Sequence, residues 1–553
     1  MNISGAHLIT RFLERRDTRV VTGLPGGAVL PLYRALADAN LTHVLARNEQ
    51  GAAFMAQGIA RVSGRAGVCI ATSGPGVTNV VTALADAKAD SAPLVCLAGQ
   101  VPRALKGTDA FQEAPTSFIV DRITKAQFEV GSAAELAELL PEAFRIAESG
   151  RPGPVLLDIP KDVLTEQVEL TDIPDPLEPE RAPAPHPHAI ARAVSMIERA
   201  ERPVLYLGGG VRIARAFAEA QQLAERASLP TVTTLMALGA LPPDHPLSLG
   251  MLGMHGARAT NRAIDECDLL IAVGARFDDR ATGKLSSFAP NARVIHIDAD
   301  PRELGKLRRP ELALHADAGC ALRALAAGVR PQLRTAWLAR VGELRRTHGL
   351  AMFRRGDLSK PYGLIEAAAA ASGPQRALTT DVGQHQMWVA QAWPIARPAT
   401  FLTSGGLGTM SFGIPTAIGA VLAEPQHGAT CVTGDGSLLM NVQELATLAD
   451  LGLDVKVLAL DNGGYGMVRQ QQSLFYDGRH QASGFPRGSR IVAIAEAFGV
   501  PAVDLGAATD PRAALEEAFA RPGPVLVRAP IDADEHVLPM VVPGGANVDA
   551  IAE

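Results

Sequence analysis

The 553-residue sequence predicts an α/β protein of three doubly wound parallel-sheet domains. Two observations predict this fold. Short apolar runs end in glycine- or proline-rich loops, and alanine-rich amphipathic stretches separate them, which indicates parallel sheets covered by helices on both faces. In addition, one proline-rich segment and one basic segment divide these runs into three groups.

Each group of apolar runs defines one domain. The runs lie at 20–27, 67–76, 93–99 and 155–159 in the first group, at 203–210, 269–276 and 294–301 in the second, and at 377–383, 429–436 and 455–462 in the third. The predicted domains are residues 1–165, 189–330 and 360–553. The acidic, proline-rich linker 171–188 is expected to be extended, and a second join lies at about 330–360.

An internal repeat relates the two ends of the chain. RPGPVLLDIP at 151–160 recurs as RPGPVLVRAP at 521–530, and in both a Pro-Gly-Pro turn precedes an apolar run. This predicts that the first and third domains are related, with chance recurrence of a short string as the alternative. In doubly wound sheets, ligands bind at the carboxyl ends of the strands, where the glycine-rich loops of this sequence lie.

The composition excludes several classes of protein. Hydrophobic residues make up 47% of the chain and charged residues 20%, which fits large buried cores and excludes a disordered or disulfide-rich chain. The net charge of −6 provides no basic surface for nucleic acid. There is no run of roughly 20 apolar residues for a membrane span, no signal peptide and no CxxC pair. We therefore expect a cytoplasmic protein without nucleic-acid or membrane partners.

Two polar motifs follow neighbouring strands of the third group. GDGS at 434–437 follows the run ATCVT, and Asn462 follows the run VKVLALD. Their side chains are therefore expected at one edge of a sheet. There the Asp435 carboxylate and the Asn462 amide oxygen suit Mg²⁺, with phosphate oxygens and water as further ligands. A helix is predicted over the following LLMNVQELATLAD, with phosphate favoured at its N-terminus. For GDG alone, a β-turn is the alternative.

GDG followed one strand later by Asn resembles the diphosphate–magnesium motif of thiamine-diphosphate enzymes. The resemblance implies a pyrimidine-binding domain with an activating glutamate near the other end of the chain. Glu49 is the candidate, because it follows the run THVLA and precedes the helix-like GAAFMAQGIA. A carboxyl group that is hydrogen-bonded to the aminopyrimidine favours the imino tautomer of the cofactor. Apolar surroundings would raise the pKa of this carboxyl group, so that it can share a proton. For Glu49 alone, a helix-terminal carboxylate is the alternative.

The resemblance extends over nearly the whole chain. The matching segments are LPGGAVLPLYRAL (24–36), ATSGPGVTNVVTALADA (71–87), GTDAFQE (107–113), LGMLGMHG (249–256), GARFDDR (274–280), SGGLGTMSFG (404–413) and QQQSLFY (470–476). Together they look like acetohydroxyacid synthase, also called acetolactate synthase. In particular they resemble the large catalytic subunit of the bacterial isozyme I type. The resemblance implies a pyrimidine-binding, a central FAD-binding and a diphosphate-binding domain.

The resemblance implies cofactor-binding roles at both ends of the chain. For thiamine diphosphate the matching residues are Glu49, Gly383, Gln384, His385, Gly408, Met410, Gly434, Gly436, Ser437 and Met467, and for Mg²⁺ they are Asp435, Asn462 and the carbonyl of Gly464. Gly408 matches the backbone acceptor for the 4′-amino group. Met410 matches the hydrophobic residue that holds the cofactor bent, and plain core packing is its alternative.

The resemblance also implies a substrate site and a flavin site. Phe111, Gln112, Lys125 and Arg276 match residues around the two 2-oxoacids. Arg276 suits a carboxylate because its guanidinium binds bidentately; an interdomain salt bridge is the alternative, as a partly exposed lysine is for Lys125. For FAD the matching residues are Arg151, Gly208, Gly209, Gly210, Thr234, Leu235, Met236, His255, Asp278, Arg280, Asp298 and Asp317. The flavin is not needed for net redox chemistry in this family.

Three positions depart from the family pattern. Asn48 stands where the family commonly has His. Asp461 stands where it has Asn, and adds a carboxylate next to the metal ligand. Gln471 aligns with the tryptophan that favours 2-oxobutanoate, so little preference for 2-oxobutanoate over pyruvate is expected.

The implied reaction begins with the decarboxylation of pyruvate on thiamine diphosphate. Transfer of the hydroxyethyl unit to a second pyruvate or to 2-oxobutanoate then gives 2-acetolactate or 2-aceto-2-hydroxybutanoate for branched-chain amino acid biosynthesis. A closing lid is expected from about 470–490 and from the tail after 535. The alternatives are an FAD-dependent pyruvate oxidase, a 2-oxoacid decarboxylase of the same fold, and a catalytically silent cofactor-binding protein. Glu49 disfavours a glutamate-independent relative such as glyoxylate carboligase.

The resemblance implies a homodimer or homotetramer. In this family the thiamine cofactor lies between the pyrimidine domain of one chain and the diphosphate domain of another. A separate small regulatory subunit is usual, and these residues neither require nor exclude one.

Overall fold

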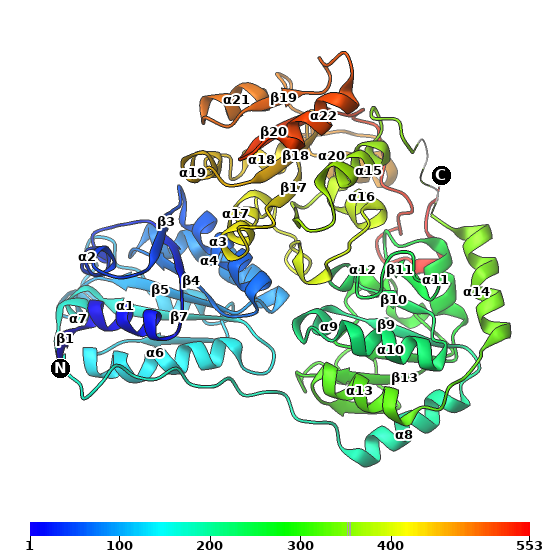
Figure 1. The fold of residues 1–553 in the computed structure, drawn as a ribbon, viewed down its shortest axis with the longest axis horizontal. Helices are drawn as coiled ribbons and strands as arrows, with labels where there is room; N and C mark the ends of the chain where they lie inside the picture. The colour runs from blue at the N-terminus through cyan, green and yellow to red at the C-terminus, as the bar shows by residue number, and fades with distance from the viewer. Residues whose placement is uncertain (351, 353–354, 553) are drawn as a thin grey trace.

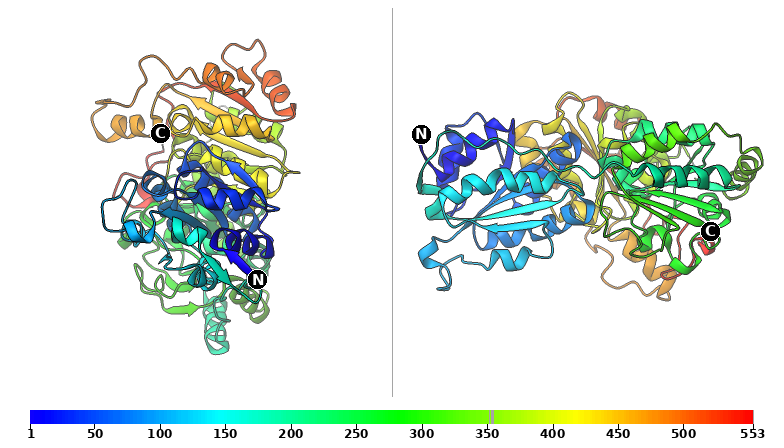
Figure 2. Two further views of the ribbon diagram at one scale, coloured as in Figure 1. Left: turned by 90° about the vertical axis from the view of Figure 1, so that its left-hand side faces the viewer. Right: turned by 90° about the horizontal axis from the view of Figure 1, so that it is seen from below.

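The computed structural model describes residues 1–350, 352 and 355–552, which form three α/β domains at the corners of a triangle (Figure 1). Each domain is built on a six-stranded parallel sheet. Figure 2 shows helices on both faces of the first and middle sheets. The predicted fold class is therefore confirmed. Within the described residues, no helix is both long and apolar enough to span a membrane.

The first and third sheets have the same connectivity. The first has the order β3-β2-β4-β5-β7-β6, from β2 (Val20–Gly23), β3 (Thr42–Leu45), β4 (Gly67–Ala71), β5 (Leu94–Gln100), β6 (Ala126–Glu129) and β7 (Pro154–Pro160). The third has the order β16-β15-β17-β18-β20-β19, from β15 (Ala377–Thr380), β16 (Phe401–Leu402), β17 (Ala429–Gly434), β18 (Val455–Asp461), β19 (Ala502–Asp504) and β20 (Val525–Pro530). The repeated segment forms β7 and β20, which hold the same place next to the sheet edge. The predicted relationship of the two domains is confirmed.

The middle sheet has the strand order of dinucleotide-binding folds. Its order is β11-β10-β9-β12-β13-β14, from β9 (Pro203–Leu207), β10 (Thr231–Thr233), β11 (Ser248–Met251), β12 (Leu269–Val273), β13 (Arg293–Asp298) and β14 (Leu312–His315). The direction of winding reverses between β9 and β12. The loops after these two strands meet there, because a Cβ on Gly208 would lie 2.1 Å from the Gly274 carbonyl oxygen.

The two predicted joins differ in structure. Between β8 (Gln167–Glu169) and α8 (Pro187–Arg199) the linker contains neither helix nor strand, and it crosses from the first to the middle domain (Figure 1). The second join contains α14 (Thr335–His348), which packs on the middle domain through Trp337, whose Nε1 donates to Pro203 O at 3.0 Å. Residues 351, 353 and 354 of that join lie outside the described residues.

The first and third domains share one hydrophobic core. It combines α3 (Glu49–Ser63) and α4 (Pro75–Asp90) of the first domain with α17 (Gly413–Ala423) and α19 (Glu444–Leu451) of the third. Helices α3 and α17 approach closely through glycines. A Cβ on Gly58 would lie 2.3 Å from Thr416 O, and one on Gly419 would lie 2.0 Å from Met55 O. Neither position has room for a larger residue.

A substitution at this helix contact tests its role. Gly58→Ala inserts a methyl group between α3 and α17, so we expect it to lower the stability of the protein by about 2 kcal/mol. Gly27→Ala is the control, because its Cβ would meet nothing within 4 Å. Urea unfolding followed by circular dichroism measures both variants. Equal midpoints for the two variants would show that the close helix contact does not limit stability.

Candidate active site

One large cleft opens where the three domains meet. Its volume is about 1190 Å³. The first domain contributes the end of α4 and residues within 148–152, the middle domain the loops after its strands, and the third domain residues within 382–387, 404–410 and 467–471. The cleft therefore lies at the carboxyl ends of the strands of the middle and third domains, where doubly wound folds bind ligands, and the first domain meets it with residues that precede its strands.

The predicted metal ligands follow neighbouring strands, β17 and β18. Asp435 begins α18 (Asp435–Leu439) and is buried, and its Oδ2 has no hydrogen-bond partner among the described residues. Burial and the nearby Asp461 carboxylate raise the pKa of Asp435 to about 8. Asn462 Nδ2 donates to Gln384 Oε1 at 3.2 Å, which leaves the amide oxygen as an acceptor. Asp435 therefore has no cationic side chain to stabilise its charged form among the described residues.

The unusual carboxylate of Asp461 is neutralised by Arg528 on the adjacent strand β20. Arg528 Nε donates to Asp461 Oδ2 at 2.6 Å, and its Nη1 donates to both oxygens of Asp504 at 3.0 and 2.9 Å. Burial opposes ionisation, but Arg528 holds the pKa of Asp461 below its ordinary value. Ser489 Oγ and Gly463 N also donate to this carboxylate, at 3.3 and 3.1 Å.

The residues predicted to hold the diphosphate gather around Asp435. Ser437 Oγ donates to Val382 O at 3.0 Å. The ring of His385 is buried against Gly434, and its Nε2 has no partner among the described residues. Burial lowers the pKa of His385 to about 3, so the ring is neutral. Gln384 Nε2 donates to Gln470 Oε1 at 2.9 Å and so ties this loop to α20 (Gly466–Phe475).

The structure differs from the sequence expectation in the helix after GDGS. We predict one helix over 438–450, but α18 ends at Leu439 and α19 starts at Glu444. Between them, Asn441 Nδ2 donates to Ser411 O at 3.2 Å. The local pattern of 438–450 does not reveal this interruption, since the partner of Asn441 lies 30 residues away in the chain.

Met410 and Gly408 line the cleft together with Met467. Met410 is half-buried, so core packing alone does not describe it. Gly408 is exposed and has a φ of 72°, in the left-handed region that favours glycine. Gln471 also lines this part of the cleft. All four belong to the third domain.

Arg276 and the predicted flavin residues line the same cleft. They are Arg151, Gly209, Gly210, Thr234, Leu235, Met236, His255, Asp278, Arg280, Asp298 and Asp317, with Gly208 at the base of the glycine loop. Arg276 Nη1 donates to Ala89 O at 2.6 Å. Among the described residues Arg276 makes no salt bridge, so the structure does not support that alternative.

Polar groups without partners face the flavin part of the cleft. Thr234 Oγ1 and Arg212 Nε are buried and have no hydrogen-bond partner within the described chain.

Burial lowers the pKa of His255 to about 4, and its Nδ1 contacts Pro539 O at 3.0 Å. The tail after 535, expected as part of a lid, is thus bonded to the middle domain in this structure.

The predicted activating glutamate belongs to the first domain. Glu49 is buried at the start of α3, and its Oε2 accepts from Asn79 Nδ2 at 2.9 Å. Asn48 is the N-cap of α3, and its side chain accepts from Gln50 N at 2.8 Å. Glu49 does not line the main cleft of its own chain.

Three predicted substrate residues also lie outside the main cleft. Phe111 is 88% exposed. Gln112 packs on Gly74 and has a φ of 61°, a strained conformation for a glutamine. The amine of Lys125 donates to Ile146 O at 2.6 Å, and burial lowers its pKa to about 8. Gln112 therefore lies beside Gly74, at the start of α4. Lys125 lies at the other end of this helix, where Lys88 Nζ donates to Thr124 O at 2.6 Å and the neighbouring Ala89 O accepts from Arg276.

Several polar residues near these sites escape sequence reasoning. They are Asn79, Arg61, Asp86, Asp90 and Arg212. Asp86 and Asp90 lie four residues apart in the alanine-rich helix α4, where two buried carboxylates need partners. That spacing is a usable signal, although it does not identify the partners.

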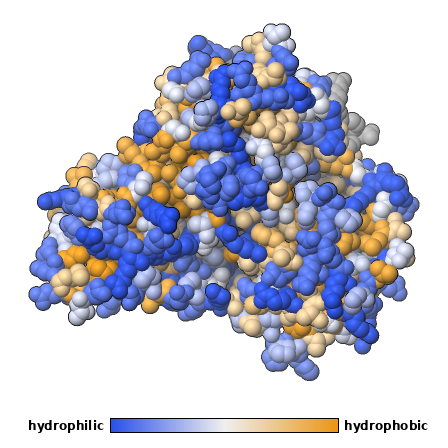
Figure 3. All heavy atoms as spheres, in the orientation of Figure 1, coloured by the Kyte–Doolittle hydropathy of each residue, from blue (hydrophilic) through white to orange (hydrophobic). Residues whose placement is uncertain are grey.

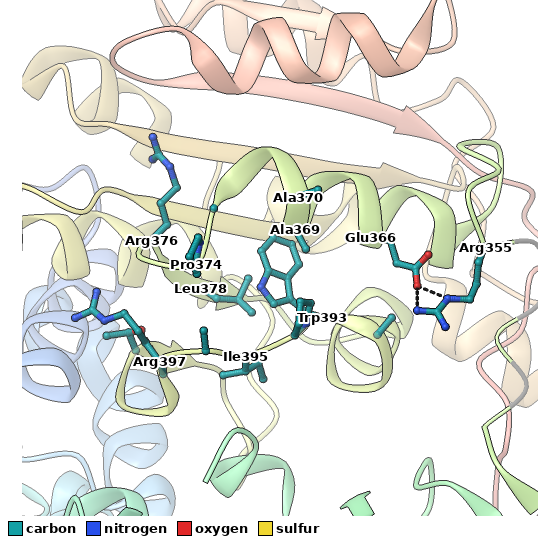
Figure 4. Close-up of a pocket in the computed structure, with 15 residues that line it drawn as sticks. Arg355, Glu366, Ala369, Ala370, Pro374, Arg376, Leu378, Trp393, Ile395 and Arg397 are labelled. Carbon is teal, nitrogen blue, oxygen red and sulfur yellow. Dashed lines mark hydrogen bonds and ion pairs between the residues drawn. The ribbon is translucent and has the colours of Figure 1, made fainter. Parts of the chain in front are cut away.

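A second hollow, of about 510 Å³, lies on the third domain beside α15 (Pro361–Ser372) (Figure 4). Three arginines line it, but each has a carboxylate partner: Arg355 binds Glu366, Arg376 binds Asp454 and Arg397 binds Glu424. None of the predicted site residues lines this hollow. The main cleft is therefore the candidate site.

Comparison with protein families agrees with this arrangement. Residues 3–119 match the N-terminal TPP binding domain of thiamine pyrophosphate enzymes, residues 190–325 match the central domain, and residues 381–529 match the C-terminal TPP binding domain. Fold and site thus define a thiamine-diphosphate enzyme.

Similar curated proteins show which family of thiamine-diphosphate enzymes the chain belongs to. The chain is 51% identical over 551 residues to the acetolactate synthase isozyme 1 large subunit of Escherichia coli, covering 100% of this chain and 98% of the relative. It is 44% identical over 550 residues to the isozyme 2 large subunit of the same organism, covering 99% of each. To the probable acetolactate synthase large subunit of Methanocaldococcus jannaschii it is 43% identical, covering 98% of this chain and 94% of the relative. The chain belongs to the acetolactate synthase large-subunit family.

The buried His385 predicts a pH dependence of stability. The folded state holds the pKa of this ring at about 3, whereas the ordinary value is 6.5. Above the ordinary value both states are neutral. Below it the unfolded state takes up the proton first, so stability falls as the pH falls. Between about pH 7.5 and about pH 5.5, the free energy of unfolding of the wild type should fall by about 1.4 kcal/mol more than that of His385→Gln. Urea unfolding of the cofactor-free protein measures this difference, and parallel losses in both proteins would contradict it.

Proposed function

We propose that this chain is the catalytic subunit of an acetolactate synthase that joins two pyruvates to 2-acetolactate with loss of CO₂. With 2-oxobutanoate as second substrate, the product is 2-aceto-2-hydroxybutanoate. The observation that carries the proposal is the shared cleft. Arg276 lies in it beside Gly383, Gly408 and Met410 of the thiamine-binding third domain.

Asp435, Asn462 and the Gly464 carbonyl fit a magnesium ion. The buried Asp435 Oδ2 lacks a partner, and a divalent cation would stabilise its carboxylate. The bridge to residues 483–485 uses Tyr465 N and Gly463 O, and so leaves the Gly464 carbonyl available. Phosphate oxygens would complete the coordination. We assign Mg²⁺ to these three residues.

The middle domain fits FAD. It has the strand order of dinucleotide-binding sheets and a glycine loop in close contact with a second loop at the switch point. Thr234 Oγ1 and Arg212 Nε are buried without partners, as expected of groups that a polar ligand satisfies. We therefore assign FAD to this part of the cleft.

Two copies of the chain are required to complete each thiamine site. Glu49 and Arg61 lie twelve residues apart on α3, which corresponds to about 18 Å along the helix. The Arg61 end contacts Thr403, close to Gly408, so Glu49 is held away from the Gly408 of its own chain. We propose that Glu49 serves the third domain of a second copy.

The surface agrees with a dimer. Apolar side chains gather where the first and third domains meet on the face shown in Figure 3. Phe111 and Phe118 are 88% and 86% exposed, which is unusual for large apolar residues outside an interface. Both Escherichia coli relatives are named large subunits, and on this ground we also propose a separate small subunit as partner.

Thiamine diphosphate, when bound, supplies the nucleophilic carbon and accepts the electron pair released with CO₂. The residues of the chain bind, orient and move protons. Arg276 has further N–H donors besides the one bonded to Ala89, and these can bind a substrate carboxylate. Glu49, held by Asn79, would share a proton with the aminopyrimidine. Gln471 stands where the family's tryptophan favours 2-oxobutanoate, so we expect little preference for 2-oxobutanoate over pyruvate as second substrate.

An assay with pyruvate tests the proposal. The protein is incubated with thiamine diphosphate, Mg²⁺ and FAD under air and under nitrogen, acetolactate is detected as acetoin after acidification, and oxygen uptake is recorded. We expect acetoin in both atmospheres. Glu49→Gln should lose at least about a hundredfold in rate, because the proton-sharing group is removed.

The alternatives give different results in the same assay. Oxygen uptake without acid-dependent acetoin would identify a pyruvate oxidase and contradict the proposal. Acetaldehyde without acetolactate would identify a simple decarboxylase. Asp162→Asn is a matched control, because this half-buried carboxylate pairs with Arg103 and neither residue lines the cleft, and it should keep the wild-type rate.

A further inference from the structure

A buried charge cluster joins the first domain to the cofactor loop of the third. It consists of Arg61 on α3 and of Asp86 and Asp90 on α4. Arg61 Nη2 donates to Asp86 Oδ1 at 3.3 Å and to Asp90 Oδ2 at 3.1 Å, and all three side chains are almost completely buried. One guanidinium faces two carboxylates, so the cluster needs further donors.

The third domain supplies these donors from residues 404–410. The backbone N–H groups of Gly405 and Gly406 donate to Asp90 at 3.0 and 2.7 Å. Thr409 Oγ1 donates to Asp86 Oδ2 at 2.9 Å, and Ser404 Oγ donates to the same oxygen. Because hydrogen bonds to a buried carboxylate are strong and costly to leave unmade, they fix the shape of the loop.

The other hydrogen bonds of the loop involve Ser404, whose carbonyl accepts from Gln386 Nε2 at 3.1 Å and whose Oγ accepts from Thr409 N at 2.8 Å, and none of them holds the glycines. Residues 404–408 contain neither helix nor strand, and Gly405, Gly406 and Gly408 are exposed. Glycines have the largest conformational freedom of any residue, so an unanchored loop of this composition would sample many shapes. Close packing helps, since a Cβ on Gly406 would lie 2.9 Å from Asp90 Oδ1.

We propose that Arg61, Asp86 and Asp90 are positioning residues for thiamine diphosphate, which act by holding Gly408 and Met410 in the shape that accepts the pyrimidine end of the cofactor. The inference rests on the roles proposed above for Gly408 and Met410. None of the three residues lies in that loop, and each acts through the bonds just described. The first domain therefore shapes the cofactor site of the third domain in its own chain.

Charge-neutralising variants test this inference. In Asp90→Asn the new NH₂ group faces the N–H donors and Arg61, so the anchors of Gly405 and Gly406 weaken. We expect the dissociation constant for thiamine diphosphate, measured by calorimetry with Mg²⁺ present, to rise about tenfold in Asp90→Asn and in Asp86→Asn. Hydrogen–deuterium exchange of residues 403–412 in the cofactor-free protein should become faster.

Asp158→Asn is the matched control. Asp158 is equally buried in the first domain and accepts from Gln100 Nε2 at 3.2 Å, but among the described residues it makes no hydrogen bond to the third domain. It should lower the melting temperature and leave both the dissociation constant and the exchange of residues 403–412 unchanged. Equal effects of Asp158→Asn and Asp90→Asn, or wild-type affinity in Asp90→Asn, would overturn the inference.

A milder variant covers the case in which Asp90→Asn does not fold. Thr409→Val removes one donor to Asp86 and leaves the pairs with Arg61 intact. We expect about a threefold weaker affinity for thiamine diphosphate, and an unchanged affinity would overturn the inference. If wild type itself does not bind thiamine diphosphate, the underlying assignment of the site fails instead.

Discussion

The packing of α3 on α17 is the constraint on which the rest of the structure depends. Gly58 and Gly419 let the two helices approach so closely that the first and third domains share one core. Glu444 strengthens the contact, because its Oε1 accepts from the backbone N–H groups of Arg47 and Asn48 at the start of α3. The two half-sites are thereby held at a fixed separation. In the proposed dimer, each chain presents them to its partner and does not close its own site.

The structure shows how the chain accommodates Asn48 and Asp461, two of the residues that depart from the family pattern. Asn48 caps the helix that begins with Glu49, so it orients the helix terminus that carries this carboxylate. Asp461 adds a negative charge next to Asn462, and Arg528 on the next strand forms an ion pair with it. In both cases a neighbouring group accommodates the unusual side chain. The site therefore retains its arrangement despite these substitutions.

The sequence alone predicted which site residues lie together where they belong to one local motif, and it did not predict the contacts between domains. Asp435 and Asn462 could be placed together because they follow adjacent parallel strands, whose ends share one sheet edge. Arg61 and Thr403 lie far apart in sequence, and only the packing of α3 on α17 brings them into contact. The same limit applies to Lys125: no local pattern shows that its amine turns to the Ile146 carbonyl.

Complementation between two inactive variants tests the central claim that each site is built from two chains. On the proposed roles, Glu49→Gln should inactivate only the first-domain half and Asp435→Ala only the third-domain half. When the variants are unfolded together and refolded in equal amounts, about half of the dimers are mixed and each holds one intact site. Acetolactate formation should then return to about a quarter of the wild-type rate. A mixture no more active than its two parents would contradict the claim.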